Sequence, residues 1–448
     1  MTTSLLAFKV GLFEEHLDEI GFLASQAQAM RTARHHSWTD AGPFEQRLEA
    51  HLDALLVGGS LALQVGKARA AQADANELFG IAALACRAAD LPLLQHIAHG
   101  SDLDDQAKLA SISHALVAEW PATWREQCLR GLGQGDSRLA PTLAAVAACR
   151  GWPTQGQLSA ALQRAPAAQR VALLGEVGRC QEDQALDLAR AHYGDTDPSV
   201  REAALRAGLR LHDPQARSLV LTGPQRPLLA ALTASRTAMP QLLTQLIGAD
   251  TPLPVIQALG LMGDLAAVRA LVALLAFEAV AAPAAQALHL ITGAPLHEQV
   301  LVPELADEDT LSEAEAERFR QSGAWPTRLD GQPFGERVDR LSQDPAVWGQ
   351  WLADHGSEFT AGCRYRLGQP CTVAWMLHSL AEPHFPAPWR ALLNEELQCR
   401  HGLKLLLRPE LPVQTQQTLL QHQQAHALAL DSHHKPGRWH AAGTELFD

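Results

Sequence analysis

Helix-forming segments begin at nearly regular intervals along this chain, and no other feature of the sequence constrains the fold as much. Eight segments rich in alanine and leucine start near residues 77, 106, 138, 169, 199, 227, 254 and 284. The intervals between these starts are 29, 32, 31, 30, 28, 27 and 30 residues. Each interval has room for two short helices and two turns. Neither helix can bury its apolar side alone, so neighbouring pairs must stack into an array.

The segment Asp197–Leu209 shows how one repeat is built. Asp197 and Pro198 form a turn and start a helix, since proline suits the first helical position. One face of this helix then carries small apolar side chains, at Val200, Ala203, Ala204 and Ala207. The segment resembles a HEAT repeat. The sequence therefore predicts an all-α fold, a HEAT-like helical-repeat solenoid.

The composition favours helices over sheets. Hydrophobic residues make up 47% of the 448 residues, but aromatic residues make up only 5% and there are two tyrosines. Alanine and leucine dominate, and the β-branched and aromatic residues that fit a pleated sheet are scarce. We expect helices in more than roughly 60% of the chain, against a base rate near one third, and no sheet of four or more strands.

Four regions are expected along the chain. Residues 1–75 form an N-terminal helical region, and residues 76–299 form the HEAT-like repeats. Residues 300–345 are an acidic linker containing glycine and proline, and residues 346–448 are a small C-terminal helical module with a frayed tail. Within the linker, Thr310-Leu311-Ser312-Glu313 fits a capping box, so a helix is expected to begin there.

The charge of the chain argues against nucleic acid as a partner. There are 49 acidic and 36 basic residues, a net charge of −13, and only five of the basic residues are lysines. Phosphate binding needs a basic face, but the arginines are scattered singly. A HEAT-like nucleic-acid enzyme such as a DNA glycosylase, with Trp120, Trp124 and Trp152 as its aromatic residues, is kept as the least favoured alternative.

The chain is expected to be a cytoplasmic protein that does not enter a membrane. Residues 1–22 lack a basic leader and contain several acidic residues, unlike a signal peptide. The longest apolar stretch, residues 265–282, contains Arg269 and Glu278 and predicts a buried helix. Seven widely spaced cysteines without a CxxC pair are typical of free thiols in a reducing compartment.

No motif predicts catalysis, a cofactor or a metal. The sequence has no glycine-rich phosphate loop with its lysine and no G-x-S-x-G motif. His422 and His426 have metal-ligand spacing, with His433, His434 and His440 nearby. The sequence lacks a glutamate base between the first two histidines and any cysteine pair. We therefore interpret this region as a solvated helix with a tail, and expect no metal.

Several blocks of sequence resemble a family of uncharacterised proteobacterial HEAT-like proteins. These blocks are His16 with Gly21-Phe22-Leu23 and Arg31, residues 44–55, Leu261-Met262-Gly263-Asp264, Leu290-Ile291-Thr292-Gly293, and residues 359–370. Genes of that family often lie in type VI secretion loci, beside spike-tip and effector genes, and the family has no established catalytic residues. The C-terminal end departs from the family, because it is rich in glutamine and histidine. In the last block we expect the Tyr365 hydroxyl to tie a bend to a backbone carbonyl.

The resemblance implies a protein-binding role without enzymatic activity. The leading hypothesis is a type VI secretion immunity protein that neutralises a cognate toxin, which could be a nuclease. The alternative is an adaptor or chaperone that loads an effector onto the secretion spike. We expect the partner to bind a solenoid face that includes Glu202, Arg206 and Arg210. A second predicted contact is the acidic segment with Glu304, Asp307, Glu308 and Asp309, which would attract a basic toxin.

Overall fold

The computed structural model describes residues 3–32, 36–154, 156–180, 184–223, 226–303, 311–322, 335–382 and 385–447. It divides into a larger unit, residues 1–242 with 370–448, and a smaller unit, residues 243–369. Helices account for 70% of the described residues, and the described strands form only two-stranded sheets. The predicted all-α, solenoid-like class is confirmed.

The larger unit starts with a long helical pair, α1 (Thr3–Thr32) and α2 (Gly42–Arg69), joined through the 3-10 helix η1 (Trp38–Ala41). The helices that follow are α3 (Ala75–Arg87), α4 (Leu91–Gly100), α5 (Gln106–Glu119), α6 (Arg125–Gln134), α7 (Ala140–Cys149), α8 (Gln157–Arg164), α9 (Ala167–Val177), α10 (Ala185–Arg190), α11 (Pro198–Arg210), α12 (Pro214–Thr222), α13 (Pro227–Thr233) and α14 (Met239–Leu243). The unit ends with α20 (Val373–Ala381), α21 (Ala387–His401), α22 (Val413–Asp431) and a hairpin of β5 (His440–Ala441) and β6 (Thr444–Glu445).

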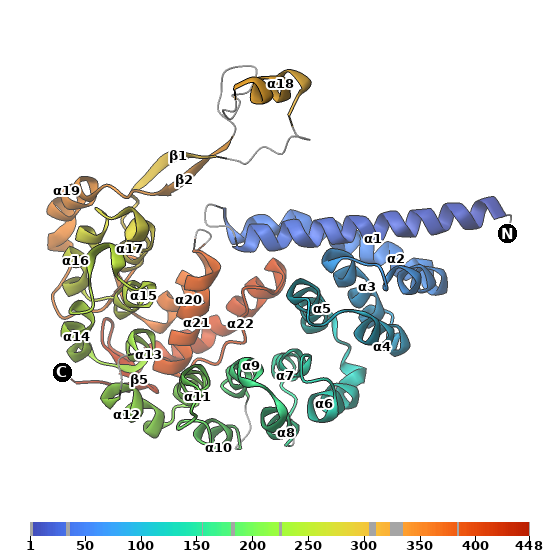
Figure 1. Cartoon of the computed structure of the whole chain (residues 1–448). Coiled ribbons are helices and arrows are strands. Elements are labelled where there is room, and N and C mark those ends of the chain that lie inside the picture. The colour runs from blue at the N-terminus through green and yellow to red at the C-terminus, as the bar shows by residue number, and fades with distance from the viewer. Residues whose placement is uncertain are drawn as a thin grey trace. The chain divides into compact units, whose positions relative to one another are not determined.

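The predicted repeat is present in the larger unit as an inner row of stacked helices. Helices α3, α5, α7, α9 and α11 pack one on the next, and Figure 1 shows the C-terminal helices α20–α22 on the side that this row faces. The helices of the row and α13 begin at residues 75, 106, 140, 167, 198 and 227. Each start lies within two residues of the start predicted from the sequence.

Side chains at both ends explain where these helices begin and end. Aspartates accept hydrogen bonds from the first backbone amides of five helices, at Asp74, Asp90, Asp105, Asp197 and Asp213. Arginines donate to the last carbonyls of other helices: Arg150 at the end of α5, Arg164 at α6, Arg210 at α9 and Arg400 at α13. Because a helix C-terminus carries partial negative charge, a guanidinium group there is favourable. Arginines that are isolated in the sequence thus connect neighbouring helices.

The apolar face of α11 differs in one residue from the prediction. Val200, Ala204 and Ala207 are buried as expected, but Ala203 is partly exposed. Gly208 is buried instead, where the Tyr193 side chain crosses the helix. The Tyr193 hydroxyl donates a 2.8 Å hydrogen bond to Asp213. A Cβ at Gly208 would overlap that hydroxyl, so the close approach requires glycine.

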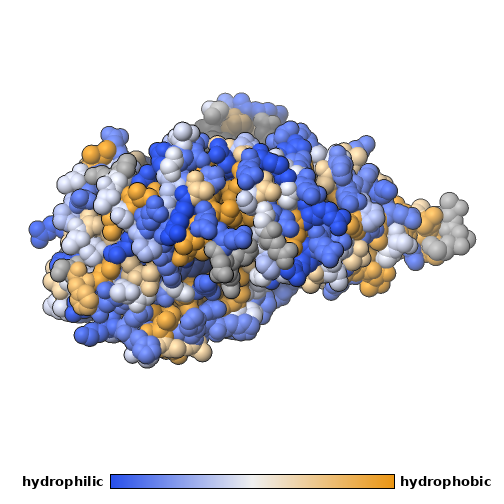
Figure 2. All heavy atoms as spheres, turned by 90° about the horizontal axis from the view of Figure 1, so that it is seen from below, coloured by the Kyte–Doolittle hydropathy of each residue, from blue (hydrophilic) through white to orange (hydrophobic). Residues whose placement is uncertain are grey.

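The first turns of α1 extend past the part of α2 that covers the rest of the helix. Gly58 lets Phe13 lie against α2, since a Cβ at this position would be 2.5 Å from the Phe13 ring. At the next residue, Gly59, the backbone turns to φ 59° and α2 kinks. Leu5, Leu6 and Phe8 are exposed beyond this point, and Figure 2 shows hydrophobic residues at this end of α1.

The smaller unit contains α15 (Leu253–Met262), α16 (Val268–Leu274), α17 (Glu278–Thr292), α18 (Glu313–Ser322) and α19 (Pro345–His355). Its strands are β1 (His297–Pro303), β2 (Gly335–Leu341), β3 (Tyr365–Arg366) and β4 (Gln369–Pro370), the last of which reaches the boundary between the units. Strands β1 and β2 pair antiparallel, with Val300 opposite Val338. The starts of α15 and α17 lie one and six residues from the predicted positions 254 and 284.

The segment 364–368 closes the ends of two helices in the smaller unit. Helix α15 ends at Gly263 and α17 at Gly293, both with positive φ. The amides of residues 365, 367 and 368 donate to carbonyls of residues 263, 290 and 291 at 2.8 to 3.0 Å. Arg364 and Arg366 donate to carbonyls of the last turn of α15. The Tyr365 hydroxyl accepts from the Thr360 amide at 2.7 Å, rather than donating to a carbonyl as predicted.

The two units do not follow the predicted regions. The repeats expected over residues 76–299 contribute to both units, and the module expected over residues 346–448 is divided at residue 370. The expected linker contains α18 and most of β1 and β2. Helix α18 begins where the capping box predicted, but Ser312 and Glu315 form the contact. The acidic residues Glu304, Asp307, Glu308 and Asp309 lie outside the described residues.

Substituting two helix glycines should separate close packing from helix propensity. Gly208→Ala should lower the free energy of unfolding by about 1–3 kcal/mol, because the added methyl group overlaps the Tyr193 hydroxyl. Gly175→Ala, in α9 with nothing within 4 Å of the added Cβ, should raise it by up to about 1 kcal/mol. Urea denaturation of both variants measures the difference. Equal destabilisation by the two substitutions would contradict the close contact between Gly208 and Tyr193.

Candidate functional site

The inner row of the larger unit is partly covered by the chain's own C-terminal part. Residues 402–412, which we call the strap, connect α21 to α22 without regular secondary structure. Leu403, Leu405 and Leu407 are buried, whereas Lys404 between them is exposed and Leu406 is partly exposed. Burial of every second residue is the pattern of an extended chain. The strap therefore lies extended, with one side covered by protein.

Side-chain amides of α21 hold the backbone of the strap. The Asn394 Nδ2 donates to the Leu407 carbonyl at 3.0 Å, and the Gln398 Nε2 donates to the Leu405 carbonyl at 2.9 Å. Four residues of helix rise about 6.0 Å and two residues of extended chain about 6.6 Å, so the two periods match. This arrangement binds a backbone with little regard to its side chains.

Two of the predicted partner-binding residues contact this C-terminal part. The Arg206 Nη1 lies 2.7 Å from Glu395 Oε2, and the Arg210 Nε lies 3.2 Å from Glu395 Oε1. Glu395 is on α21 with only 2% of its side chain exposed. Glu202, 3.8 Å from Arg206, stays 47% exposed. Arg206 and Arg210 thus bind the chain itself, which differs from the prediction that they face a partner.

A second ion pair fixes the far end of the strap. Arg408 pairs with Glu176 of α9, and Arg179 lies 2.9 Å from the same carboxylate. Burial of Glu176 opposes its charged form, but the guanidinium groups of Arg179, Arg408 and Arg210 together hold the pKa of Glu176 below its usual range. The carboxylate is therefore charged at neutral pH and its charge is compensated.

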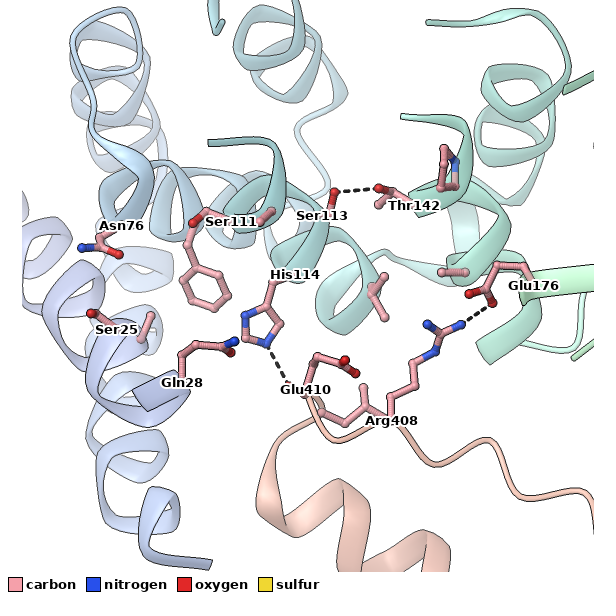
Figure 3. A pocket seen from close by; sticks show the side chains of 17 residues that line it. Ser25, Gln28, Asn76, Ser111, Ser113, His114, Thr142, Glu176, Arg408 and Glu410 are labelled. Atoms are coloured by element: carbon pink, nitrogen blue, oxygen red, sulfur yellow. Dashed lines mark hydrogen bonds and ion pairs between the residues drawn. The ribbon is translucent and has the colours of Figure 1, made fainter. Parts of the chain in front are cut away.

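Beside this end of the strap, a pocket of about 490 Å³ opens between α1, α3, α5 and α7. We call it the inner pocket (Figure 3). Its polar side chains are Ser25, Gln28, Asn76, Ser111, Ser113, His114, Thr142, Glu176, Arg408 and Glu410. The hydroxyls of Ser113 and Thr142 are 2.6 Å apart and join α5 to α7. The rest of the lining is apolar and includes Phe79, Val117 and Leu411.

His114 stands at the centre of this region and is neutral. Its Nε2 lies 3.0 Å from the carbonyl of Glu410 in the strap, and its ring is 5.2 Å from that of Phe79. Since a carbonyl only accepts, Nε2 carries the proton and Nδ1 is an acceptor. Burial first, and the charge of Arg31 next, lower the pKa of His114 to about 4.

A second pocket of about 730 Å³ lies beside His114 and Leu411, between α1, α2, α5 and the start of α22. Charged residues line it in paired sets. Arg31 pairs with Glu45, and Arg87 lies 2.7 Å from both Glu49 and Glu119. Because three carboxylates surround two guanidinium groups, this pocket carries a net negative charge.

The histidines that were considered as metal ligands do not form a metal site in the described residues. His422 and His426 are exposed on α22, and His433 is exposed after it. The ring centroids of His434 and His440 lie 5.4 and 5.0 Å from that of His401, and 4.2 Å from each other. Over the part of the chain that the structure describes, no group of three or more histidine, cysteine or acidic side chains is arranged to hold a metal ion.

The aromatic residues considered for a nucleic-acid site are used in packing. Trp120 and Trp124 are buried, their rings meet edge to face at 5.7 Å, and the Trp120 indole donates to the Trp124 carbonyl. The Arg150 guanidinium lies 6.0 Å from the Trp152 ring. Among the helices in the described residues, none combines the length and the apolar character needed to cross a membrane.

Comparison with known protein families, curated proteins and solved structures gives no match. The resemblance to the HEAT-like family of type VI secretion loci therefore stays a prediction.

Removing the His114 imidazole should change how stability depends on pH. The folded-state pKa of about 4 lies below the usual 6.5, so the unfolded chain binds the proton more readily. The stability of the native protein is then fully present above pH 6.5 and falls as the pH drops towards 4, by on the order of 2 kcal/mol. In His114→Gln, this part of the decrease in stability at low pH should be absent.

Melting temperatures between pH 4 and 8 provide the measurement. His422→Gln, which removes an exposed histidine, should follow the wild-type curve. If the His114→Gln and wild-type curves were parallel, the His114 ring would not be desolvated as the structure places it.

Proposed function

We propose that this protein is a non-enzymatic scaffold that binds another protein through the inner row of its larger unit. The observation that supports the proposal most directly is the inner pocket beside the strap. At α9 and α11 the inner row is covered by the chain's own α21 and strap, whereas at α3, α5 and α7 it lines a pocket together with α1. A surface that already binds a segment of protein over part of its length is suited to binding one over the rest.

The charges around the inner pocket favour binding over catalysis. A general base works best with a pKa near the operating pH, but the pKa of His114 is about 4. Glu176 is held in its charged form by arginines. Groups of this kind fix the geometry of a surface and are poorly tuned to move protons at neutral pH.

The biological setting that we propose is type VI secretion, on the basis of the family resemblance. Within it, the leading role is an immunity protein that neutralises a cognate toxin in the cytoplasm. A net charge of −13 supports a basic partner such as a nuclease toxin, because opposite charges accelerate association. Loading of an effector onto the secretion spike is the second role, and it uses the same surface.

Co-expression with the toxin encoded beside the gene tests this function. We expect cells to survive the toxin, and the two proteins to copurify. Association of the purified proteins should slow as salt rises from 0.05 to 0.5 M, since screening beyond about 10 Å sets in near 0.1 M. Copurification can be repeated with a toxin inactivated in its catalytic centre, which separates binding from survival.

An unrelated toxin of similar charge is the control, and it should neither copurify nor be neutralised. Copurification without rescue, together with loss of toxin secretion when the gene is deleted, would reject the immunity role and support the loading role. Failure to copurify at any salt concentration would contradict the proposal that the scaffold binds this toxin.

A further inference from the structure

The larger unit contains its own example of an extended segment that lies on the inner row, held from one side by α21 and from the other by side chains of α9 and α5. The strap is extended, its backbone carbonyls accept from the amides of Asn394 and Gln398, and its Arg408 reaches the Glu176 carboxylate on α9. The inner row itself contributes the ion pair at Glu176 and the contact from His114 to one backbone carbonyl, whereas α21 holds two further carbonyls. The strap ends beside α5, where the His114 ring contacts the Glu410 carbonyl.

Polar side chains continue along the inner row beyond the end of the strap. Ser111 on α5, Asn76 on α3 and Ser25 on α1 line the inner pocket, and Figure 3 shows them coming from three different helices. Within the described residues, these three side chains have no hydrogen-bond partner in the protein. Gln28 accepts from Arg31 through its oxygen and keeps its amide hydrogens for a ligand. The row therefore offers both donors and acceptors, which is what a peptide backbone requires.

The spacing of the row suits an extended chain. Packed helices lie about 8–10 Å apart, which is about three residues of extended backbone at 3.3 Å each. From α5 through α3 to the adjoining α1, the helices therefore accommodate roughly six residues. Phe79, Val117 and Leu411 add apolar surface in the same pocket for every second side chain.

One carboxylate of the inner pocket, that of Glu410, interacts electrostatically with Arg31 but forms no ion pair of its own. Glu176 is paired with Arg179 and Arg408, and the nearby Arg31 is paired with Glu45. The carboxylate of Glu410, which is exposed, has no hydrogen bond or ion pair within the described part of the chain. A ligand with a positive charge at this position would supply the missing partner.

From these observations we propose that the inner pocket binds an extended segment of the partner protein, about six residues long. Apolar residues alternate along this segment, and a lysine or arginine pairs with Glu410. The inference rests on the proposed scaffold function and specifies its ligand. The segment continues along the row that the strap occupies at α9, so one partner segment and the strap lie on successive helices.

A displayed library of random 12-residue peptides, selected on the full-length protein, provides the probe. We expect enrichment of peptides with alternating apolar residues and one or two lysines or arginines. Fluorescence polarisation of labelled selected peptides then measures the dissociation constant for wild type and variants. Ala110→Trp places a large ring in the pocket from an exposed position, and should weaken binding by at least about tenfold.

Matched variants control for changes away from the pocket. Ala107→Trp adds the same ring at an exposed position of the same helix outside both pockets, and should change the dissociation constant less than about twofold. Glu410→Gln should weaken binding about threefold to tenfold, more at low salt. Glu126→Gln, which neutralises an exposed carboxylate on α6, should leave it unchanged. Melting temperatures of all four variants should stay close to wild type.

The results separate this inference from the proposed function. Failure to enrich peptides, or equal binding to wild type and Ala110→Trp, would overturn the inference. If the toxin copurified with Ala110→Trp as with wild type and selected peptides did not compete, the scaffold function would stand and the pocket would be wrong. Peptide binding that Ala110→Trp abolishes, without copurification of the toxin, would support the pocket and reject the toxin.

Discussion

The carboxylate of Glu395 lies between the guanidinium groups of Arg206 and Arg210, with 2% of its side chain exposed. A buried charge costs several kcal/mol unless paired charges and hydrogen bonds offset that cost. Helix α21 can therefore lie against α11 only because α11 provides two cations. The same helix carries Asn394 and Gln398, which hold the strap. The position of the strap, and with it one wall of the inner pocket, depends on this ion-paired contact.

Local sequence patterns were sufficient to predict the helices but not the contact at Glu395. Helix starts such as Asp197-Pro198 depend on residues within one turn, and the structure has α11 beginning at Pro198. Residues 394–401 of α21, in contrast, are polar enough to predict a solvated helix, yet all of them are buried. Their partners lie far away in the chain, since Arg206 and Glu395 are 189 positions apart. The pattern of residues within one helix does not predict a contact with a residue so distant in the chain.

The inner pocket could not be predicted from the sequence for a related reason. Ser25, Asn76 and Ser111 are single polar residues on three helices, and they come together only when stacking decides which face of each helix lines the inner pocket. The strap gives no clear signal either, because Leu406 interrupts the alternation of Leu403, Lys404 and Leu405, and the burial of every second residue becomes visible only in the structure.

Three sequence blocks behind the family resemblance meet at one place in the smaller unit. Residues 261–264 and 290–293 are the ends of α15 and α17, and residues 359–370 include the segment that closes both. A Cβ at Gly293 would lie 2.6 Å from the Leu367 carbonyl carbon, and one at Gly263 would overlap the backbone carbonyl oxygen of Tyr365. Packing of the backbone is a sufficient physical reason for these residues to occur together. They do not by themselves indicate a binding site.

The smaller unit is inserted between residues 242 and 370 of the larger one, and this affects the order of events on the ribosome. At about 5–20 residues per second, the 189 residues from Arg206 to Glu395 take roughly 10–40 s to synthesise. During that time the inner row is complete but uncovered, with the guanidinium groups of Arg206 and Arg210 in water. The smaller unit can fold meanwhile. A nascent chain therefore exposes the whole inner row to other proteins before its own C-terminal part competes for it.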